Sequence, residues 1–269
     1  MITISDDEFK SLSSYIKKFY GIDLTKKKGL IEGRLSNVIS ERFNSLTEYL
    51  EYIFSHPNSD DAKKLISKLT TNYTYFMREA AHFKYFSEEV VPYLVNKISD
   101  KDMRIWSAGC SSGEEPYTLA MIIHDHLGDK IKEWDTKILA TDISAKALGE
   151  AKQGIYQKKS LQDLPPLWKL KYFDSIDNDN FKICNSIKED IIFRSFNLME
   201  ETYPFKRKFH VIFCRNVMIY FDMDTKRKLI RKLFDYTEPG GYLFIGHSES
   251  LNRNDSGFEY IMPSVYRKP

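Results

Sequence analysis

The sequence predicts an α/β protein with a small all-helical domain at residues 1–75, followed by a mostly parallel sheet covered by helices on both faces at residues 76–269. The first part carries two helix-capping boxes and apolar residues at helical spacing. From residue 103 onward, short apolar runs alternate with helical patterns, which favours parallel strands joined by helices. We therefore expect two domains, with the sheet starting at Met103.

Composition excludes several classes of protein. Apolar residues make up 42% of the 269 positions, and the formal net charge of +2 gives no general argument for binding nucleic acid or a membrane. The cysteines, Cys110, Cys184 and Cys214, lie too far apart for a disulfide framework or a metal pair. Without a signal-peptide pattern or a run of about 18 apolar residues, we expect a cytoplasmic protein that does not insert into membranes.

The sequence predicts four helices in the N-terminal part. Capping boxes at Ser5–Glu8 and Ser45–Glu48 open two of them, and Gly21 ends the first. Apolar spacing predicts the others at 26–43 and about 60–69. The middle of this domain is basic, because it contains Lys17, Lys18, Lys26, Lys27, Lys28 and Arg34. These residues either form a solvated face or bind an acidic partner surface.

Residues 70–80 link the two domains and are rich in Thr, Asn and aromatic residues. Such a run either forms a plain linker helix or provides caps, turns and aromatic walls for a ligand. A helix from about 81 to 98 follows. The alternating part then predicts strands at 103–107, 136–141, 191–196, 209–214 and 242–246, and helices at 116–127, 144–153 and 223–237.

Two features interrupt or close this alternation. Residues 155–191 predict a helical piece and a hairpin around the turn-rich stretch 174–180, which we interpret as a small antiparallel β insertion. Near the end, Pro239–Gly241 predicts a turn, and the stretches 258–262 and 265–267 predict a final antiparallel pair.

The glycine turn after the first strand indicates the kind of ligand. Its pattern is Gly109-x-x-x-Gly113, not the G-x-G-x-x-G of a dinucleotide site. Two acids, Glu114 and Glu115, follow directly; they would repel a pyrophosphate but suit a cation. Asp142 ends the second strand, where it suits a ribose diol. Each acid alone could be an ordinary helix-terminal residue, but together they favour S-adenosylmethionine.

Several longer motifs occur in order along the chain: TNYTYFMRE at 71–79, SAGCSSGEEPY at 107–117, ATDIS at 140–144, FNL at 196–198, CRNVMIYF at 214–221 and GHSE at 246–249. Together they resemble the chemotaxis receptor glutamate O-methyltransferases, the CheR family. The resemblance implies a Rossmann-like class I methyltransferase domain with a β subdomain insertion. It also implies S-adenosylmethionine as cofactor, S-adenosylhomocysteine as product, and glutamates on the cytoplasmic helical bundle of chemoreceptors as substrates.

The resemblance also implies site residues. Those nearest the transferred methyl are Arg78, Arg215 and Tyr220. Cofactor contacts fall on the linker, the glycine turn and the strand ends: Asn72, Thr74, Arg78, Gly109, Glu115, Asp142, Ile143, Asn197, Leu198, Cys214, Arg215 and Asn216. In some members the β subdomain grips a receptor tether, but the short turn at 174–180 argues against it here.

An ionised carboxylate needs no general base to attack a methyl group, and Arg78 or Arg215 could hold it through two parallel hydrogen bonds. We expect no metal, because neither His124 nor His126 has a carboxylate or cysteine partner at metal spacing; His82, His210 and His247 stay unassigned. Two alternatives are a same-fold enzyme acting on RNA or a small acid, and a non-catalytic binding module. We expect a monomer with no nucleic-acid partner.

Overall fold

The computed structural model describes residues 4–25, 27–35, 42–57, 59–251 and 256–269. Its N-terminal part contains α1 (Asp6–Tyr20), α2 (Lys28–Leu35), α3 (Leu46–Ser55) and α4 (Asp60–Leu69). The Ser5 capping box forms, and Gly21 ends α1 in the left-handed conformation, as predicted. The helix predicted at 26–43 is present as α2, and residues 36–41 lie outside the described part of the chain.

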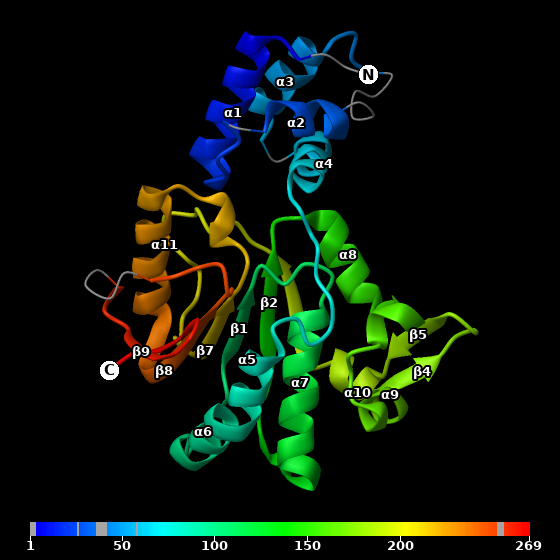
Figure 1. Ribbon diagram of the computed structural model, residues 1–269, viewed down its shortest axis with the longest axis vertical. Coiled ribbons are helices and arrows are strands. Elements are labelled where there is room, and N and C mark those ends of the chain that lie inside the picture. Colours follow the sequence, from blue (N-terminus) through cyan, green and yellow to red (C-terminus); the bar gives the residue numbers. More distant parts are fainter. Residues whose placement is uncertain (1–3, 26, 36–41, 58, 252–255) are drawn as a thin grey trace.

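The linker that follows α4 is extended, so it is not a helix. The helix predicted at 81–98 is present as α5 (Ala80–Tyr85), a π-helical turn (Phe86–Val90) and α6 (Val91–Lys97). In Figure 1 the four N-terminal helices form a group at one end of the sheet, and the linker runs down from α4 alongside it.

The main sheet has the strand order β6-β2-β1-β7-β8-β10-β9. Its parallel strands are β1 (Ile105–Ala108), β2 (Ile138–Asp142), β6 (Ile191–Ser195), β7 (Phe209–Cys214) and β8 (Thr237–Ile245). The predicted final pair is present as β9 (Glu259–Met262) and β10 (Val265–Arg267), and β10 is also antiparallel to β8. The strands β1, β2 and β7 lie together at the centre, so their carboxyl ends meet at one edge.

One predicted turn is wrong. Pro239–Gly241 lies inside β8 instead of before it, because β8 pairs with β7 from Thr237 onward. The pairing shifts in register near Phe209, and Gly240 has φ of +75°. A bulge of this kind lets a strand keep its pairing while it absorbs extra residues. The glycines that suggested a turn therefore accommodate an irregular strand.

Helices cover both faces of the sheet, as predicted. These are α7 (Glu114–Leu127), α8 (Ala145–Gln153) and α11 (Met223–Tyr236), together with the helices α5 and α6. Side chains alternate between two cores: Ile105 and Phe213 pack with α5 to α7, while Trp106 and Ile212 pack with α11 and the N-terminal helices. No helix in the described part of the chain is both long and apolar enough to cross a membrane.

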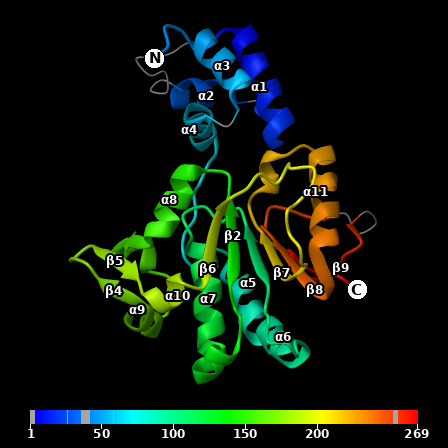
Figure 2. The ribbon, with the colours of Figure 1, turned by 180° about the vertical axis from the view of Figure 1, so that it is seen from behind.

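The insertion forms a separate small sheet. Its order is β3-β5-β4, with β3 (Ile155–Gln157), β4 (Phe173–Ser175) and β5 (Asn180–Ile183), flanked by α9 (Pro166–Tyr172) and α10 (Asn185–Lys188). The sequence predicted the helical piece and the hairpin but not β3. Seen from behind in Figure 2, this sheet projects sideways beyond α7 and α8.

Candidate active site between the two domains

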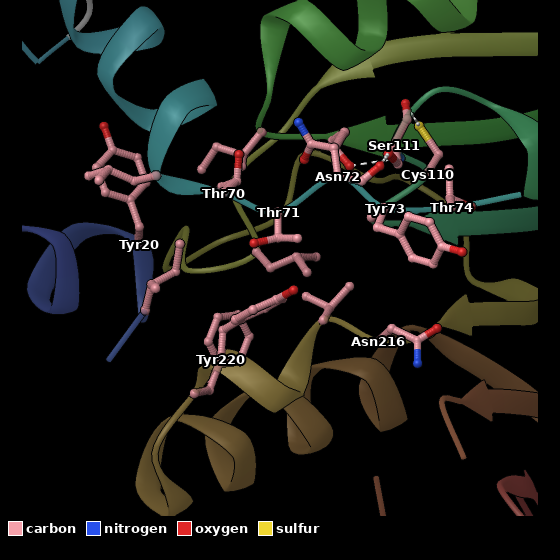
Figure 3. A pocket seen from close by; sticks show the side chains of 18 of the residues that line it. Tyr20, Thr70, Thr71, Asn72, Tyr73, Thr74, Cys110, Ser111, Asn216 and Tyr220 are labelled. Atoms are coloured by element: carbon pink, nitrogen blue, oxygen red, sulfur yellow. Dashed lines mark hydrogen bonds between the residues drawn. The ribbon is translucent and has the colours of Figure 1, made fainter. Parts of the chain in front are cut away.

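A deep cavity lies where the carboxyl ends of β1, β2, β6 and β7 meet the linker and the helical domain. All predicted site residues except Cys214 line it: Asn72, Thr74, Arg78, Gly109, Glu115, Asp142, Ile143, Asn197, Leu198, Arg215, Asn216 and Tyr220. Cys214 is fully buried in the core at the end of β7. Figure 3 shows linker residues Thr71 to Thr74 across the cavity from Tyr220 and Asn216.

Three successive amides of the glycine turn are already hydrogen-bonded within the protein. Gly109 and Cys110 both donate their N–H to the Thr141 carbonyl, at 2.7 and 2.9 Å, and Ser111 donates to Asp142 Oδ2 at 2.8 Å. A phosphate-binding loop needs such amides free to point at the anion. This turn therefore suits a ligand without phosphate.

Gly109 is required by its surroundings. Its φ is +94°, and a Cβ placed on it would lie 2.4 Å from Cγ2 of Val217. The close approach brings the turn after β1 against the loop after β7. Two loops that each carry predicted site residues are thereby held at a fixed spacing.

Asp142 offers a carboxylate to the cavity, and among the described residues it forms no ion pair. Its oxygens accept hydrogen bonds from the amides of Ser111 and Ser144, both at 2.8 Å. Burial raises the pKa of Asp142, and these amide bonds oppose that rise. Since a carboxylate has room for about four acceptor bonds, Asp142 can still accept from ligand hydroxyl groups.

Arg215 joins three parts of the site through a buried guanidinium, with 3% of its side chain exposed. Nη1 donates to Glu115 Oε2 at 2.9 Å, and Nη2 donates to Glu79 Oε2 at 3.0 Å and to the Arg78 carbonyl. With the weaker bond from Nε to Glu79 at 3.4 Å, four of its five N–H groups are engaged. Of the two arginines expected to hold a carboxylate, Arg215 is tied to the protein.

The two acids of the glycine turn have separate environments. Glu115 lines the cavity, and its other oxygen accepts from Ser107 Oγ at 2.7 Å. Glu114 is buried beside Ser112, which donates to it at 2.7 Å, and burial raises the pKa of Glu114. Neighbouring helix residues point in different directions, so the two adjacent acids meet different surroundings; the family resemblance implied Glu115 alone as a cofactor contact.

Glu79 was not among the predicted site residues, although it ends the first motif. Besides Arg215, it accepts from the Asn216 side-chain amide and the His247 backbone N–H, both at 3.2 Å. Charge pairing with Arg215 and these hydrogen bonds outweigh burial and lower the pKa of Glu79. Glu79 thus connects the linker to the ends of β7 and β8.

Glu249, in the last motif, was also missed. Its carboxylate accepts from the amides of Gly246, Asn216 and Ile219 at 2.6, 3.0 and 3.1 Å. Burial raises the pKa of Glu249, and the amide bonds counter that rise. It holds the loop that leads from Arg215 to Tyr220. A lone acid in a motif gave no sign of this internal role.

Arg78 and Tyr220 lie at the more open side of the cavity. Arg78 Nη1 donates to the Tyr73 carbonyl at 2.6 Å, and its guanidinium lies 5.8 Å from the Tyr73 ring, which is 71% exposed. Lys27 Nζ lies 5.0 Å from the centre of the Tyr220 ring. Cationic and aromatic groups therefore surround the route into the site.

Comparison with known proteins agrees with this geometry. The family model "CheR methyltransferase, SAM binding domain" matches residues 72–266, and "CheR methyltransferase, all-alpha domain" matches residues 7–70. The chain belongs to the CheR methyltransferase family. A chemotaxis protein methyltransferase of Borreliella burgdorferi is 42% identical over 99% of this chain and 96% of its own. One from Escherichia coli is 32% identical over 98% and 92%.

This CheR-family chain is therefore an S-adenosylmethionine-dependent methyltransferase, as predicted. The residues present fit that cofactor, which carries a cationic sulfonium and a ribose diol but no phosphate. The turn after β1 leaves few amides for an anion, and Asp142 is an ionisable acceptor at the end of β2.

The helical domain of the methyltransferase supplies one wall of the cavity, including Tyr20, Ile22, Lys27 and Arg34. It is joined to the catalytic domain by a shared apolar cluster and by polar contacts. Asn197 Nδ2 donates to the Phe19 carbonyl at 2.7 Å, and Lys17 pairs with Asp222 at 2.8 Å.

Three of the basic residues considered as a partner dock are already engaged. Besides Lys17, Lys28 pairs with Asp6 at 2.5 Å, and Arg34 donates to the Leu69 carbonyl at 2.8 Å. Lys26 lies outside the described residues.

The histidines outside the cavity lining have different surroundings. His124 Nε2 lies 2.7 Å from Asp190 Oδ2, and His124 belongs to no group of metal-binding side chains among the described residues. Asp190 is far along the chain, at the start of β6, so spacing on α7 could not reveal it. His82 is fully buried, and burial, assisted by the charge of Arg215, lowers its pKa to about 4.

Proposed function

We propose that this methyltransferase esterifies glutamate side chains on the cytoplasmic helical bundle of chemoreceptors. The observation that carries the proposal is the asymmetry of the cavity. Its floor holds acceptors and occupied amides, which suit the methyl donor. Its open side presents Arg78 beside the exposed ring of Tyr73, which suits an incoming carboxylate on a larger partner. Relatives named chemotaxis protein methyltransferases support the receptor as that partner.

The reaction needs no general base from the protein. The glutamate oxygen forms the new C–O bond while the sulfur–methyl bond of S-adenosylmethionine breaks, leaving S-adenosylhomocysteine. Since a glutamate of pKa near ~4.3 is already ionised at neutral pH, the chain has to desolvate, aim and hold it. Orientation of this kind can supply roughly 7–11 kcal/mol of a barrier.

We assign separate roles to the predicted residues. Asp142 accepts hydrogen bonds from the ribose hydroxyls, and Asn72, Thr74 and Asn197 complete the cofactor walls. Arg78 holds the substrate carboxylate and Tyr220 shapes the methyl slot. Arg215 positions Glu115, because its guanidinium donates to Glu115 while it is also held by Glu79 and the Arg78 carbonyl. Any cofactor contact by Cys214 comes from its backbone, because its side chain is buried in the core.

The finer features of the partner follow from the same geometry. We infer that the receptor bundle docks at the cavity mouth and that the β subdomain plays no part as a tether clamp. Its hairpin turn is short and internally bonded, with Asp177 accepting from the Asn180 amide at 2.8 Å. We also expect the enzyme to act as a cytoplasmic monomer.

The test is transfer of radiolabelled methyl groups to receptor fragments, to RNA and to no added substrate. We expect label in the receptor alone, as base-labile esters. Replacing Arg78 by Lys should lower kcat/KM for the receptor at least tenfold while the Kd for S-adenosylhomocysteine changes less, because a lysine cannot form the paired bonds of a guanidinium. Label in RNA would support the same-fold alternative, and cofactor binding without transfer to any substrate would support a binding module.

A further inference from the structure

A carboxylate and two imidazoles gather beside the cavity, behind the Arg215 network. Glu79 and His82 come from the start of α5, and His247 follows β8. Their ligand atoms all lie within 4.8 Å of one another. His82 Nδ1 is 3.4 Å from Glu79 Oε2, and the two imidazole rings are nearly perpendicular with centres 4.7 Å apart.

His82 is the unusual member of this group. It is 0% exposed, and neither ring nitrogen has a hydrogen-bond partner among the described residues. An unpaired buried polar group costs about 1–3 kcal/mol, so it calls for an explanation. The nearby Pro263 carbonyl favours the protonated form of the His82 ring, but its position does not satisfy hydrogen-bond geometry. A neutral imidazole has a single N–H, so the other nitrogen keeps an unused lone pair.

The spacing of one donor pair, on Glu79 and His82, is that of a metal site. Zinc binds imidazole nitrogen and carboxylate oxygen at about 2.0–2.2 Å in a tetrahedron, which places two neighbouring donors about 3.3–3.6 Å apart. The 3.4 Å between His82 Nδ1 and Glu79 Oε2 falls in that range. His247 is exposed, so its ring can turn to complete a third bond.

We propose that Glu79, His82 and His247 bind a divalent transition metal ion, with Zn²⁺ the best match to two imidazoles and one carboxylate. This departs from the expectation of no metal, which rested on spacing along single helices. A water molecule would take the fourth position. Because Glu79 Oε2 also accepts from Arg215 at 3.0 Å, the metal competes with that ion pair and loosens the tie from Glu79 to Glu115.

The test is direct metal binding by the full chain. We would titrate Zn²⁺ by calorimetry and Co²⁺ by visible absorption, for wild type, His247→Ala and His126→Ala. His247→Ala keeps the backbone N–H that Glu79 accepts. His126 is exposed on α7 and belongs to no described group of metal-binding side chains, so it is the matched control.

We expect a Zn²⁺ site that His247→Ala weakens at least tenfold and His126→Ala leaves unchanged. Co²⁺ should give the d–d bands of nitrogen and oxygen ligands. Equal binding by His247→Ala, an intense thiolate band from a cysteine, or no saturable binding would each overturn the proposal. Zinc should also weaken S-adenosylhomocysteine binding in wild type but not in His247→Ala; an unchanged affinity would overturn the competition with Arg215.

Discussion

The floor and the helical wall of the cavity are built in different ways. The floor consists of strand ends tied by buried charges: Arg215 has 3% of its side chain exposed, and Glu79 and Glu115 have 13% and 12%. The helical wall combines apolar packing, in which Ile22 and Phe221 share one buried cluster, with charged ties near solvent, such as Lys17 with Asp222, which are 48% and 29% exposed. A buried network fixes geometry, whereas exposed ties contribute little. Buried charges therefore fix the floor around a small cofactor, whereas the charged ties of the wall contribute little to holding it.

Backbone conformation shows the same contrast. Among the described residues, Met77, Glu79, Ser111 and Asn216 are non-glycine residues with φ between +48° and +61° in the linker and the loops beside the floor; Lys101 and Ser264 share this conformation away from the cavity lining. In the described part of the helical domain, every residue with positive φ is a glycine. Such conformations cost about 1–3 kcal/mol each and persist where the surroundings impose them. The strain is concentrated where side chains must be aimed.

Removing Arg215 should break the floor and have the largest effect. Arg215→Ala leaves Glu79 and Glu115 buried without a cation, and losing one partner of a buried pair costs about 3–5 kcal/mol of unfolding free energy. Urea denaturation would measure it, with the exposed Lys63→Ala as control, which should unfold like wild type. Equal midpoints for all three proteins would show that the network does not stabilise the fold.

Asp142→Ala should affect the cofactor more than the fold. Losing hydrogen bonds to a charged acceptor should weaken S-adenosylhomocysteine binding by about 1.5–3 kcal/mol, or at least tenfold. Calorimetry on wild type, Asp142→Ala and the exposed Asp163→Ala would measure it. A normal Kd for Asp142→Ala would remove it from the site.

The pH dependence of cofactor binding sharpens the assignment of Asp142. The ionised carboxylate is the acceptor, and burial raises its pKa above the ordinary aspartate value. Affinity should therefore fall as pH decreases through this raised pKa, at a higher pH than for an ordinary aspartate. Asp142→Asn should lose that dependence, because an amide does not titrate there. An identical pH profile in the variant would assign the titration to another group.

Two glycine substitutions compare a constrained site with an open one. Gly109→Ala introduces a methyl group 2.4 Å from Val217 at φ of +94°, and overpacking should cost about 1–3 kcal/mol and weaken cofactor binding. Gly149→Ala, within α8 with nothing inside 4 Å, should stabilise by about 0.5–1 kcal/mol. Thermal melts of both variants would show shifts of opposite sign; a tolerated Gly109→Ala would mean that the two loops can separate.

Lys17→Ala should have the smallest effect. Its ion pair with Asp222 joins the two domains near solvent, and salt screens such pairs. We expect an unchanged melting curve and unchanged cofactor affinity at physiological salt. A clear loss of either would show that the helical wall is as rigid as the floor.

The sequence determined the local chemistry of this protein. Capping boxes, apolar spacing and the alternation of strands with helices predicted the helical domain, the parallel sheet and the final antiparallel pair. The motifs indicated the family and most of the residues that line the cavity. These patterns act over a few residues, so they can be recognised without knowing what packs against them.

The tertiary structure decided which partner each charged group meets. Glu115 and Glu114 are adjacent in the chain, yet one faces the cavity and the other is buried beside Ser112. Arg215 binds acids 136 and 100 residues away, and His82 meets His247 through the end of β8. Such contacts depend on strand order and loop position, which no local pattern records.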